Sequence, residues 1–144
     1  DNMAINGIVY VEGGGLTMNK SGSDDDIFYS GTGSILVEGH TQINVNLETS
    51  GGNSYPSNVL AVMTPTTICF DAASSNVMGL FYAEDSVTFQ KQTDIMGTIV
   101  SNYFDMGTNV PSIFQVPATL TNLPPGLVGT QGVYAMRVVA WIRQ

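Results

Sequence analysis

The stretch Gly79-Leu-Phe-Tyr-Ala-Glu-Asp-Ser-Val-Thr-Phe89, followed by Gly97-Thr-Ile-Val-Ser-Asn-Tyr-Phe104, decides the fold that we expect of this chain. Each half begins with a glycine and continues through apolar, aromatic and β-branched residues, which are typical of strands. The second glycine follows the first by 97 − 79 = 18 positions. We therefore interpret the two halves as successive turns of one coil.

The same cadence occurs earlier in the chain with a longer spacing. Val11-Glu-Gly13 returns as Val37-Glu-Gly39, an offset of 37 − 11 = 26 positions. Ile43 to Ile68 is 25 positions, and Ile68 to Val87 is 19. Independent hairpins would not repeat a strand–glycine–strand unit in this way. The sequence therefore predicts an all-β fold, a right-handed parallel β-solenoid (β-helix) of about five coils, stacked about 4.8 Å apart.

A chain of 144 residues is expected to form one domain. We expect the coils over residues 1–107, with loops 19–26 and 48–58 projecting from them, because both loops are polar and rich in Gly and Ser. Residues 108–144 are expected to form an extended, Pro-rich C-terminal wrap, because proline cannot donate to a strand ladder. Within it, residues 132–143 are predicted to be a final strand that pairs with an edge or packs over the stack, with a short helix as the alternative.

Alternation of apolar and polar residues along each predicted strand selects the residues that face inward. The predicted core is Ile8, Tyr10, Leu16, Ile35, Val37, Ile43, Val45, Leu60, Val62, Ile68, Phe70, Leu80, Val87, Phe89, Ile99, Tyr103 and Phe104. The single cysteine, Cys69, lies in an apolar run and is expected to be a buried thiol.

Charge and hydropathy exclude some classes of partner. The formal net charge is −8, and the four basic residues are scattered, so binding to nucleic acid is not expected. No apolar run is long enough to span a membrane. The chain begins at Asp1 without a signal peptide, from which we expect a processed protein or a domain of a longer one.

Repeats across nearly the whole chain resemble the β-solenoid domains of PilX-like minor pilins and related type IV pilus assembly proteins. The matching segments are Gly7-Ile-Val-Tyr-Val-Glu-Gly13, Ser34-Ile-Leu-Val-Glu-Gly39, Val77-Met-Gly-Leu-Phe-Tyr-Ala-Glu84, Gly97-Thr-Ile-Val-Ser101, Leu123-Pro-Pro-Gly126 and Val138-Val-Ala-Trp141. The resemblance implies an extracellular domain at a bacterial cell surface, part of a longer membrane-anchored protein, with pilin subunits or a surface ligand (glycan or protein) as partners. A looser likeness to bactofilins implies a self-polymerising scaffold.

Aromatic residues are the first candidates for ligand contacts, because exposed rings stack on sugars or fill partner pockets. We name Tyr82, Tyr103, Phe104 and Trp141 as candidate ligand-binding residues, and Phe114 beside them. The simpler interpretation is that most of these side chains lie in the core or under the Pro-rich wrap.

Acidic residues form two further groups. Asp24, Asp25 and Asp26 could offer oxygens to Ca²⁺, although they lack the spacing of an EF-hand loop, and a solvated loop is the simpler interpretation. Glu84 and Asp85, with Asp94 and Asp105, could supply the carboxylate pair of a glycan-cleaving enzyme, but twelve acids in the chain make such grouping unremarkable by chance.

His40 is expected to be a surface turn residue, no catalytic motif stands out, and no cofactor is expected. Taken with the resemblance to pilus proteins, these observations favour a non-enzymatic structural or adhesive display domain of a type IV pilus-associated protein. A self-polymerising scaffold and a carbohydrate-binding or carbohydrate-active protein remain as alternatives.

Overall fold

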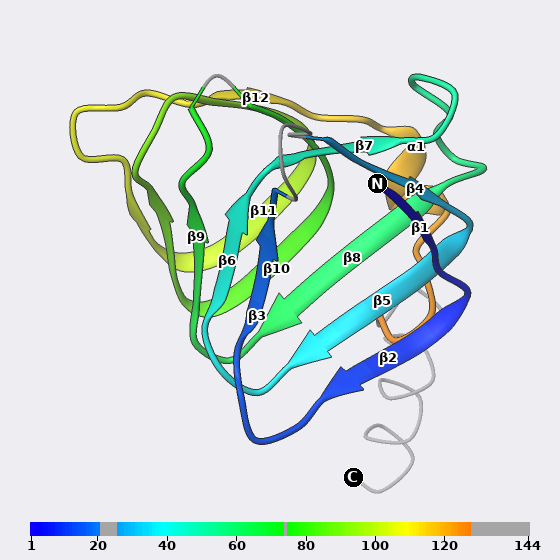
Figure 1. The fold of residues 1–144 in the computed structure, drawn as a ribbon, viewed down its shortest axis with the longest axis horizontal. Coiled ribbons are helices and arrows are strands. Elements are labelled where there is room, and N and C mark those ends of the chain that lie inside the picture. The colour runs from blue at the N-terminus through cyan, green and yellow to red at the C-terminus, as the bar shows by residue number, and fades with distance from the viewer. Residues whose placement is uncertain (21–25, 74, 128–144) are drawn as a thin grey trace, which may run out of the picture.

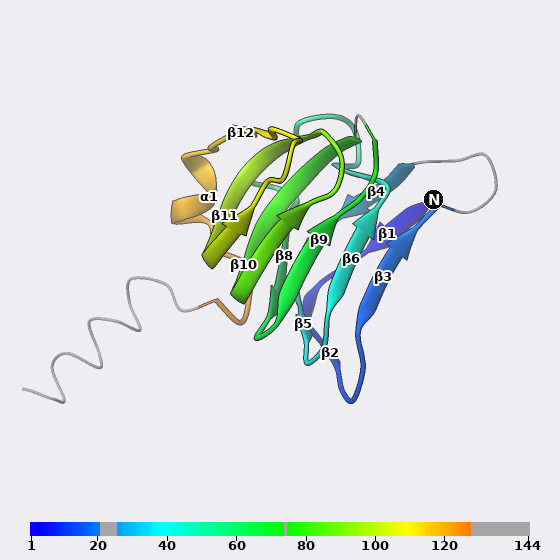
Figure 2. The ribbon, with the colours of Figure 1, turned by 90° about the vertical axis from the view of Figure 1, so that its left-hand side faces the viewer.

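The computed structural model describes residues 1–20, 26–73 and 75–127 of the chain. The fold is all-β, with 60% strand and 3% helix, and its twelve strands form one curled sheet shaped like a half-barrel (Figures 1 and 2). The strands are β1 (Asn2–Ala4), β2 (Gly7–Val11), β3 (Leu16–Asn19), β4 (Asp26–Ser30), β5 (Thr32–Val37), β6 (Thr41–Asn44), β7 (Asn46–Thr49), β8 (Val59–Thr64), β9 (Thr67–Phe70), β10 (Ser75–Phe89), β11 (Thr93–Asp105) and β12 (Ser112–Phe114).

The pairings fall into three rows of parallel strands. In the first row, β1 pairs with β4 and β4 with β7. In the middle row, β2 pairs with β5 and β5 with β8. In the third row, β3 pairs with β6 and β6 with β9. The long strand β10 pairs with β7, β8 and β9 in turn, and β11 runs beside β10. The predicted all-β fold with parallel strands is confirmed.

The register confirms most of the spacing read from the repeats. Gly79 pairs with Gly97, Ile68 with Val87, and Val11 with Val37, which are the predicted offsets of 18, 19 and 26. One pairing was predicted wrongly: Ile43 pairs with Phe70, an offset of 70 − 43 = 27, instead of with Ile68. Because side chains alternate with a period of two, this shift of two residues leaves the same side chains facing inward.

The core lies on the concave side of the curled sheet. Ten of the predicted core residues are buried there, at 6% exposure or less: Ile35, Val37, Ile43, Val45, Leu60, Val62, Ile68, Phe70, Val87 and Phe89. Cys69 is buried as expected.

 Two further predicted core residues, Leu16 and Ile99, are only partly buried and pack against the core cluster. Leu80 is buried from the opposite direction, on the outer surface of the sheet beneath the C-terminal segment.

Four of the predicted core residues are exposed instead. Ile8 and Tyr10 are 53% and 58% exposed, because the alternation along β2 turns them outward. Val9 pairs with the buried Ile35 but is itself 47% exposed, because β2 pairs with β5 alone among the described strands. Tyr103 is 63% exposed on the outer surface of β11. Phe104 pairs with the buried Val87 but is 40% exposed, because no described strand lies beyond this part of β11 to cover it.

The C-terminal segment is less irregular than the predicted extended wrap. After β11 it forms β12, which pairs with Asp94–Met96, and a short helix α1 (Ala118–Thr121). Leu123 and Leu127 then pack on the outer surface of β8 and β10. The predicted final strand over 132–143 lies outside the described residues. None of the helices in the described ranges is long and apolar enough to cross a membrane.

Two adjacent strands approach closely at the paired glycines of β10 and β11. Gly97 has φ +151°, a backbone conformation that L side chains rarely adopt, and a Cβ atom built on it would collide with the carbonyl group of Gly79. Only a residue without a side chain fits at this point of the ladder.

We expect Gly97→Ala to lower the free energy of unfolding by about 3 kcal/mol, because it adds backbone strain and a clash with the neighbouring strand. Urea denaturation followed by circular dichroism measures the change. Gly14→Ala is the matched control, since nothing lies within 4 Å of a Cβ built there. Equal stability of the two variants would contradict the close approach.

Candidate functional site: an acidic groove on the outer surface

A ladder of polar residues crosses the outer surface of five neighbouring strands. We call it the polar ladder: Asp26, Asn46, Asn76, Asp94 and Ser112, contributed by β4, β7, β10, β11 and β12. Asn46 Nδ2 donates to Asp26 Oδ1 at 2.6 Å, and the backbone N–H of Asn76 donates to Asn46 Oδ1 at 3.0 Å. Parallel register places these residues side by side, because each strand is aligned with its neighbour residue by residue.

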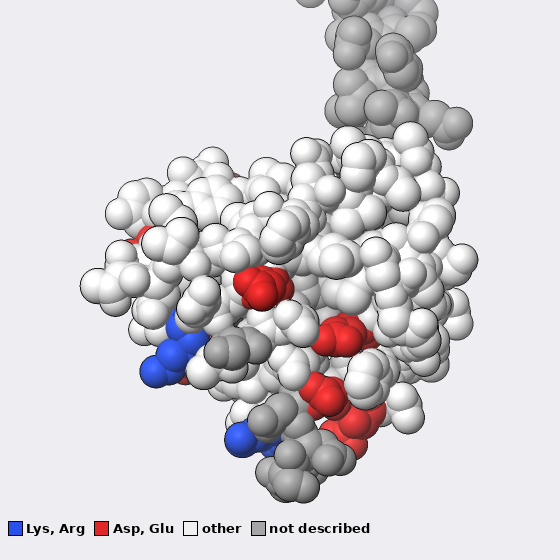
Figure 3. Space-filling model, turned by 90° about the horizontal axis from the view of Figure 1, so that it is seen from above, with Lys and Arg blue, Asp and Glu red and all other residues white. Residues whose placement is uncertain are grey.

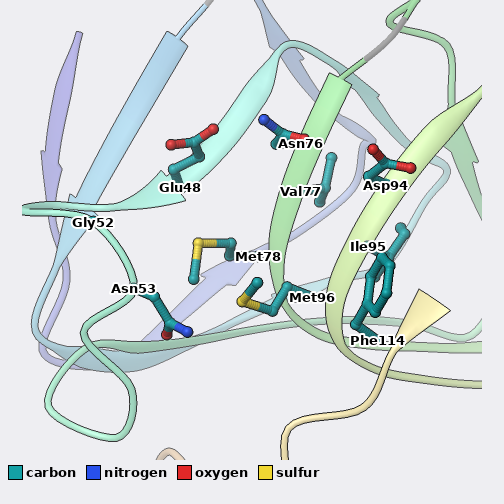
Figure 4. A pocket seen from close by; sticks show the side chains of 10 residues that line it. All are labelled: Glu48, Gly52, Asn53, Asn76, Val77, Met78, Asp94, Ile95, Met96 and Phe114. Atoms are coloured by element: carbon teal, nitrogen blue, oxygen red, sulfur yellow. The ribbon is translucent and has the colours of Figure 1, made fainter. Parts of the chain in front are cut away.

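A groove of about 310 Å³ lies next to the polar ladder. It is lined by Glu48, Gly52, Asn53, Asn76, Val77, Met78, Asp94, Ile95, Met96 and Phe114 (Figure 4). Met78 is almost completely buried, whereas the ring of Phe114 is 60% exposed. Figure 3 shows acidic side chains at several places on the face seen from above, with two basic side chains near them. The groove therefore combines carboxylates and amides with two thioethers and one accessible ring.

The loop between β7 and β8 contributes Gly52 and Asn53 to the groove, and hydrogen bonds from residues at both of its ends hold its conformation. Thr49 Oγ1 donates to the carbonyl of Gly52 and accepts from the backbone N–H of Ser54 at 3.2 Å. Asn58 Nδ2 donates to Ser54 Oγ at 2.8 Å. These bonds fix the conformation of the loop that was predicted to project over 48–58, and Figure 1 shows it extending from the sheet after β7.

Tyr55 anchors the same loop to the sheet. Its hydroxyl donates to the carbonyl of Met96 at 3.1 Å and accepts from the hydroxyl of Tyr29 at 3.4 Å. Burial raises the pKa of Tyr55 to about 12 and also raises the pKa of Tyr29. Both hydroxyls therefore stay neutral at physiological pH, and the bond from Tyr55 ties the loop to Met96, which lines the groove.

The chemistry of the groove suits a ligand with hydroxyl or amine groups and an apolar face. Carboxylates accept hydrogen bonds, and side-chain amides both donate and accept them. Methionine and phenylalanine provide an adaptable apolar surface. Within residues 1–20, 26–73 and 75–127, no group of three or more His, Cys, Asp or Glu is arranged to hold a metal ion.

The structure separates the aromatic candidates from one another. Tyr82 is 38% exposed on the outer surface of the middle row, whereas Tyr103 and Phe104 lie at the far part of β11. None of these three lines the groove, but Phe114 does. Trp141 lies outside the described residues.

The acidic candidates are also distributed. Asp24 and Asp25 lie outside the described residues, and Asp26 belongs to the polar ladder, where its backbone carbonyl also accepts from the N-terminal amino group at 2.8 Å. Glu84 lines a second hollow on the middle row, away from the groove that Asp94 lines. His40 is exposed between two strands, in agreement with the expected turn position.

Sequence reasoning missed Glu48, Asn53 and Asn76. The spacing of 18 that aligned Gly79 with Gly97 also aligns Asn76 with Asp94, so this part of the polar ladder was visible in the repeat. Nothing in the sequence pattern brings Glu48 and Asn53 beside it, because their positions depend on the path of the loop.

We expect the free energy of unfolding to fall as pH rises from about 10 to about 12. The hydroxyls of Tyr29 and Tyr55 are held neutral in the folded state, whereas an unfolded tyrosine has a pKa near 10. A folded pKa above the unfolded value gives stability that is complete below pH 10 and is lost as the pH rises. Denaturant titrations at a series of pH values measure it. The double variant Tyr29→Phe/Tyr55→Phe should show a shallower decline, and the same decline in this variant would contradict the assignment.

Comparisons with known proteins were made for the whole chain. No protein-family model matches it, and neither the curated proteins nor the solved structures give a match. The likeness to PilX-like minor pilins and bactofilins thus receives no support from these comparisons.

Proposed function

We propose that this chain is a non-enzymatic adhesive display domain of a type IV pilus-associated protein at a bacterial cell surface. In this proposal the curled sheet is a right-handed solenoid of about five coils, in which each coil passes through the three rows of strands. The observation that carries the proposal is the acidic groove, an accessible binding site formed on the outer surface of a continuously paired sheet.

A rigid base supports the proposal. The residues that follow the polar ladder on β7, β10 and β11 are Leu47, Val77 and Ile95; they are at most 1% exposed, and their strands are paired in register. The polar ladder is held by its own hydrogen bonds. A preorganised surface loses little conformational entropy on binding, so weak polar contacts can contribute to affinity.

Among surface ligands, a glycan fits the groove best. Glu48, Asp94 and the amides of Asn53 and Asn76 provide acceptors and donors for sugar hydroxyls. The exposed ring of Phe114 provides a face on which a sugar can stack. A volume of about 310 Å³ is at the small end of ligand pockets, which range from about 300 to 1,000 Å³. We therefore propose that a short glycan segment is bound.

A self-polymerising scaffold is the second candidate function, and one observation favours it. In the described part of the chain, β2 pairs only with β5, and β12 pairs with β11 only at Asp94–Met96. Unpaired N–H and C=O groups at such edges can accept a strand from another copy. Sedimentation velocity over a wide concentration range distinguishes this candidate, because fibres grow with concentration and a display domain stays monomeric.

We expect Glu48→Gln, Asp94→Asn and Phe114→Ala each to weaken binding of a glycan by about tenfold, because each removes one strong contact worth about 1.5 kcal/mol. A glycan array with the full chain identifies the ligand, and titration calorimetry measures the affinities. Asp85→Asn is the matched control: Asp85 is exposed on β10 and does not line the groove.

Two outcomes would contradict this function. Failure to bind any glycan on a broad array, or equal affinity of the groove variants and the Asp85→Asn control, would remove the groove as an adhesive site. Turnover of a bound glycan would instead assign a glycan-cleaving activity, with Glu48 and Asp94 as the carboxylates to examine.

A further inference from the structure

A stripe of apolar residues crosses the outer surface of the middle row of strands. We call it the apolar stripe: Tyr10, Leu36, Met63, Tyr82 and Val100, one residue each from β2, β5, β8, β10 and β11, paired in register. Tyr10 and Val100 are more than half exposed, and Tyr82 is 38% exposed. Figure 1 shows β2, β5 and β8 lying side by side across this surface. Leu36 and Met63 between them are partly buried. A continuous apolar line of this kind marks a surface that another segment or molecule can cover.

The chain already covers the neighbouring line of outward residues. That line is Ile8, Ser34, Ala61, Leu80 and Thr98, two residues before the apolar stripe on each strand. Leu123 and Leu127 pack against Ala61 and Leu80, and Ser34 Oγ donates to the carbonyl of Pro125. A Cβ built on Gly126 would lie 3.3 Å from Ile8 Cδ1, so the covering segment reaches β2, the first strand of the row.

Two adjoining hollows follow the apolar stripe. One of about 210 Å³ lies beside the covering segment and is lined by Leu120, Leu123 and Leu127. The other, of about 280 Å³, is lined by Tyr10, Leu36, Glu38 and Glu84. Met63 and Tyr82 line both hollows, so together they make one trough along the stripe. Leu127, the last described residue, is itself in its wall.

One rim of the trough is negatively charged. Glu38 accepts from the hydroxyl of Tyr10 at 2.6 Å and from the backbone N–H of Gly13 at 2.7 Å. The first of these bonds, followed by the second, lowers the pKa of Glu38, so the carboxylate stays ionised at neutral pH. Glu84 lines the same hollow and is exposed. An occupant of the trough should therefore be apolar and carry positive charge.

We propose that residues 128–144 of this same chain occupy the trough and cover the apolar stripe. The segment begins where the covering segment ends, beside the stripe. It has 144 − 127 = 17 residues. Crossing five strands spaced about 4.8 Å apart requires only about six extended residues, so the length is more than sufficient.

The composition of the segment matches the trough. Ten of its residues are apolar: Val128, Val133, Tyr134, Ala135, Met136, Val138, Val139, Ala140, Trp141 and Ile142. Arg137 and Arg143 are its only charged side chains, which is half of the basic residues in the chain, and it contains no Asp or Glu. Its positive charge complements the carboxylates of Glu38 and Glu84.

A second copy of the chain is a poorer occupant. Pairing two identical stripes about a twofold axis would bring the same acidic rim from each copy together. At a net charge of −8 each, the two copies also repel one another over a longer range. Residues 128–144 have neither disadvantage, and their attachment to Leu127 makes their local concentration high.

The only tryptophan of the chain, Trp141, lies in the proposed occupant and reports on its surroundings without background. In the full chain we expect blue-shifted tryptophan emission and poor quenching by acrylamide, at all protein concentrations. Tyr82→Glu places a carboxylate in the trough, so we expect a red shift and a several-fold rise in the quenching constant. Tyr103→Glu, which changes an equally aromatic exposed residue outside the trough, is the control and should leave both unchanged.

Arg137→Glu tests the same contact from the other side and does not alter the sheet. We expect it to release Trp141 as Tyr82→Glu does, with an unchanged far-ultraviolet circular dichroism spectrum. Emission of a fully exposed tryptophan in the unaltered chain would overturn the proposal. So would shielding of Trp141 that persists in both variants, which would place the segment elsewhere, and so would shielding that grows with protein concentration, which would assign the trough to a second copy.

Discussion

The parallel register between β10 and β11 is the constraint on which the rest of the structure depends. It runs from Ser75 paired with Thr93 to Thr88 paired with Asp105, with one irregularity after Ala83, and β10 also pairs with one strand of each row. The paired glycines Gly79 and Gly97 allow the two backbones to approach at one point of this register. Because every row is aligned through these two long strands, side chains with the same orientation form straight lines across the sheet.

The lines on the outer surface differ in polarity between the first row and the middle row. In the first row, polar residues repeat from strand to strand and leave an open groove beside the polar ladder. In the middle row, apolar residues repeat, and one line of them is already covered by Leu123 and Leu127. The two surfaces therefore have different roles for a physical reason: one presents hydrogen-bonding groups to solvent, and the other presents surface that is more stable when it is covered.

Repetition made much of the fold predictable. A single spacing identified the pairing of Gly79 with Gly97, and the alternation along β5 and β6 identified Ile35, Val37 and Ile43 as core residues. The same reasoning failed at β2, where Ile8 and Tyr10 were assigned to the core. β2 is apolar on both sides, so alternation cannot tell the inner surface from the outer one. Both residues lie on the outer surface. Ile8 begins the line of outward residues beside the covering segment, and Tyr10 begins the apolar stripe.

The sequence by itself determined the strands, their parallel order and most of their register, because these follow from local propensity and from a repeat that the residues carry directly. Tertiary structure alone decided which surface of β2 is buried, where the loop carrying Asn53 and Tyr55 returns, and that Glu48 lies in the same groove as Asp94. These features depend on contacts between residues far apart in the chain, such as the bond from Tyr55 to Met96. No local pattern encodes such contacts, because they exist only once the strands have been brought side by side.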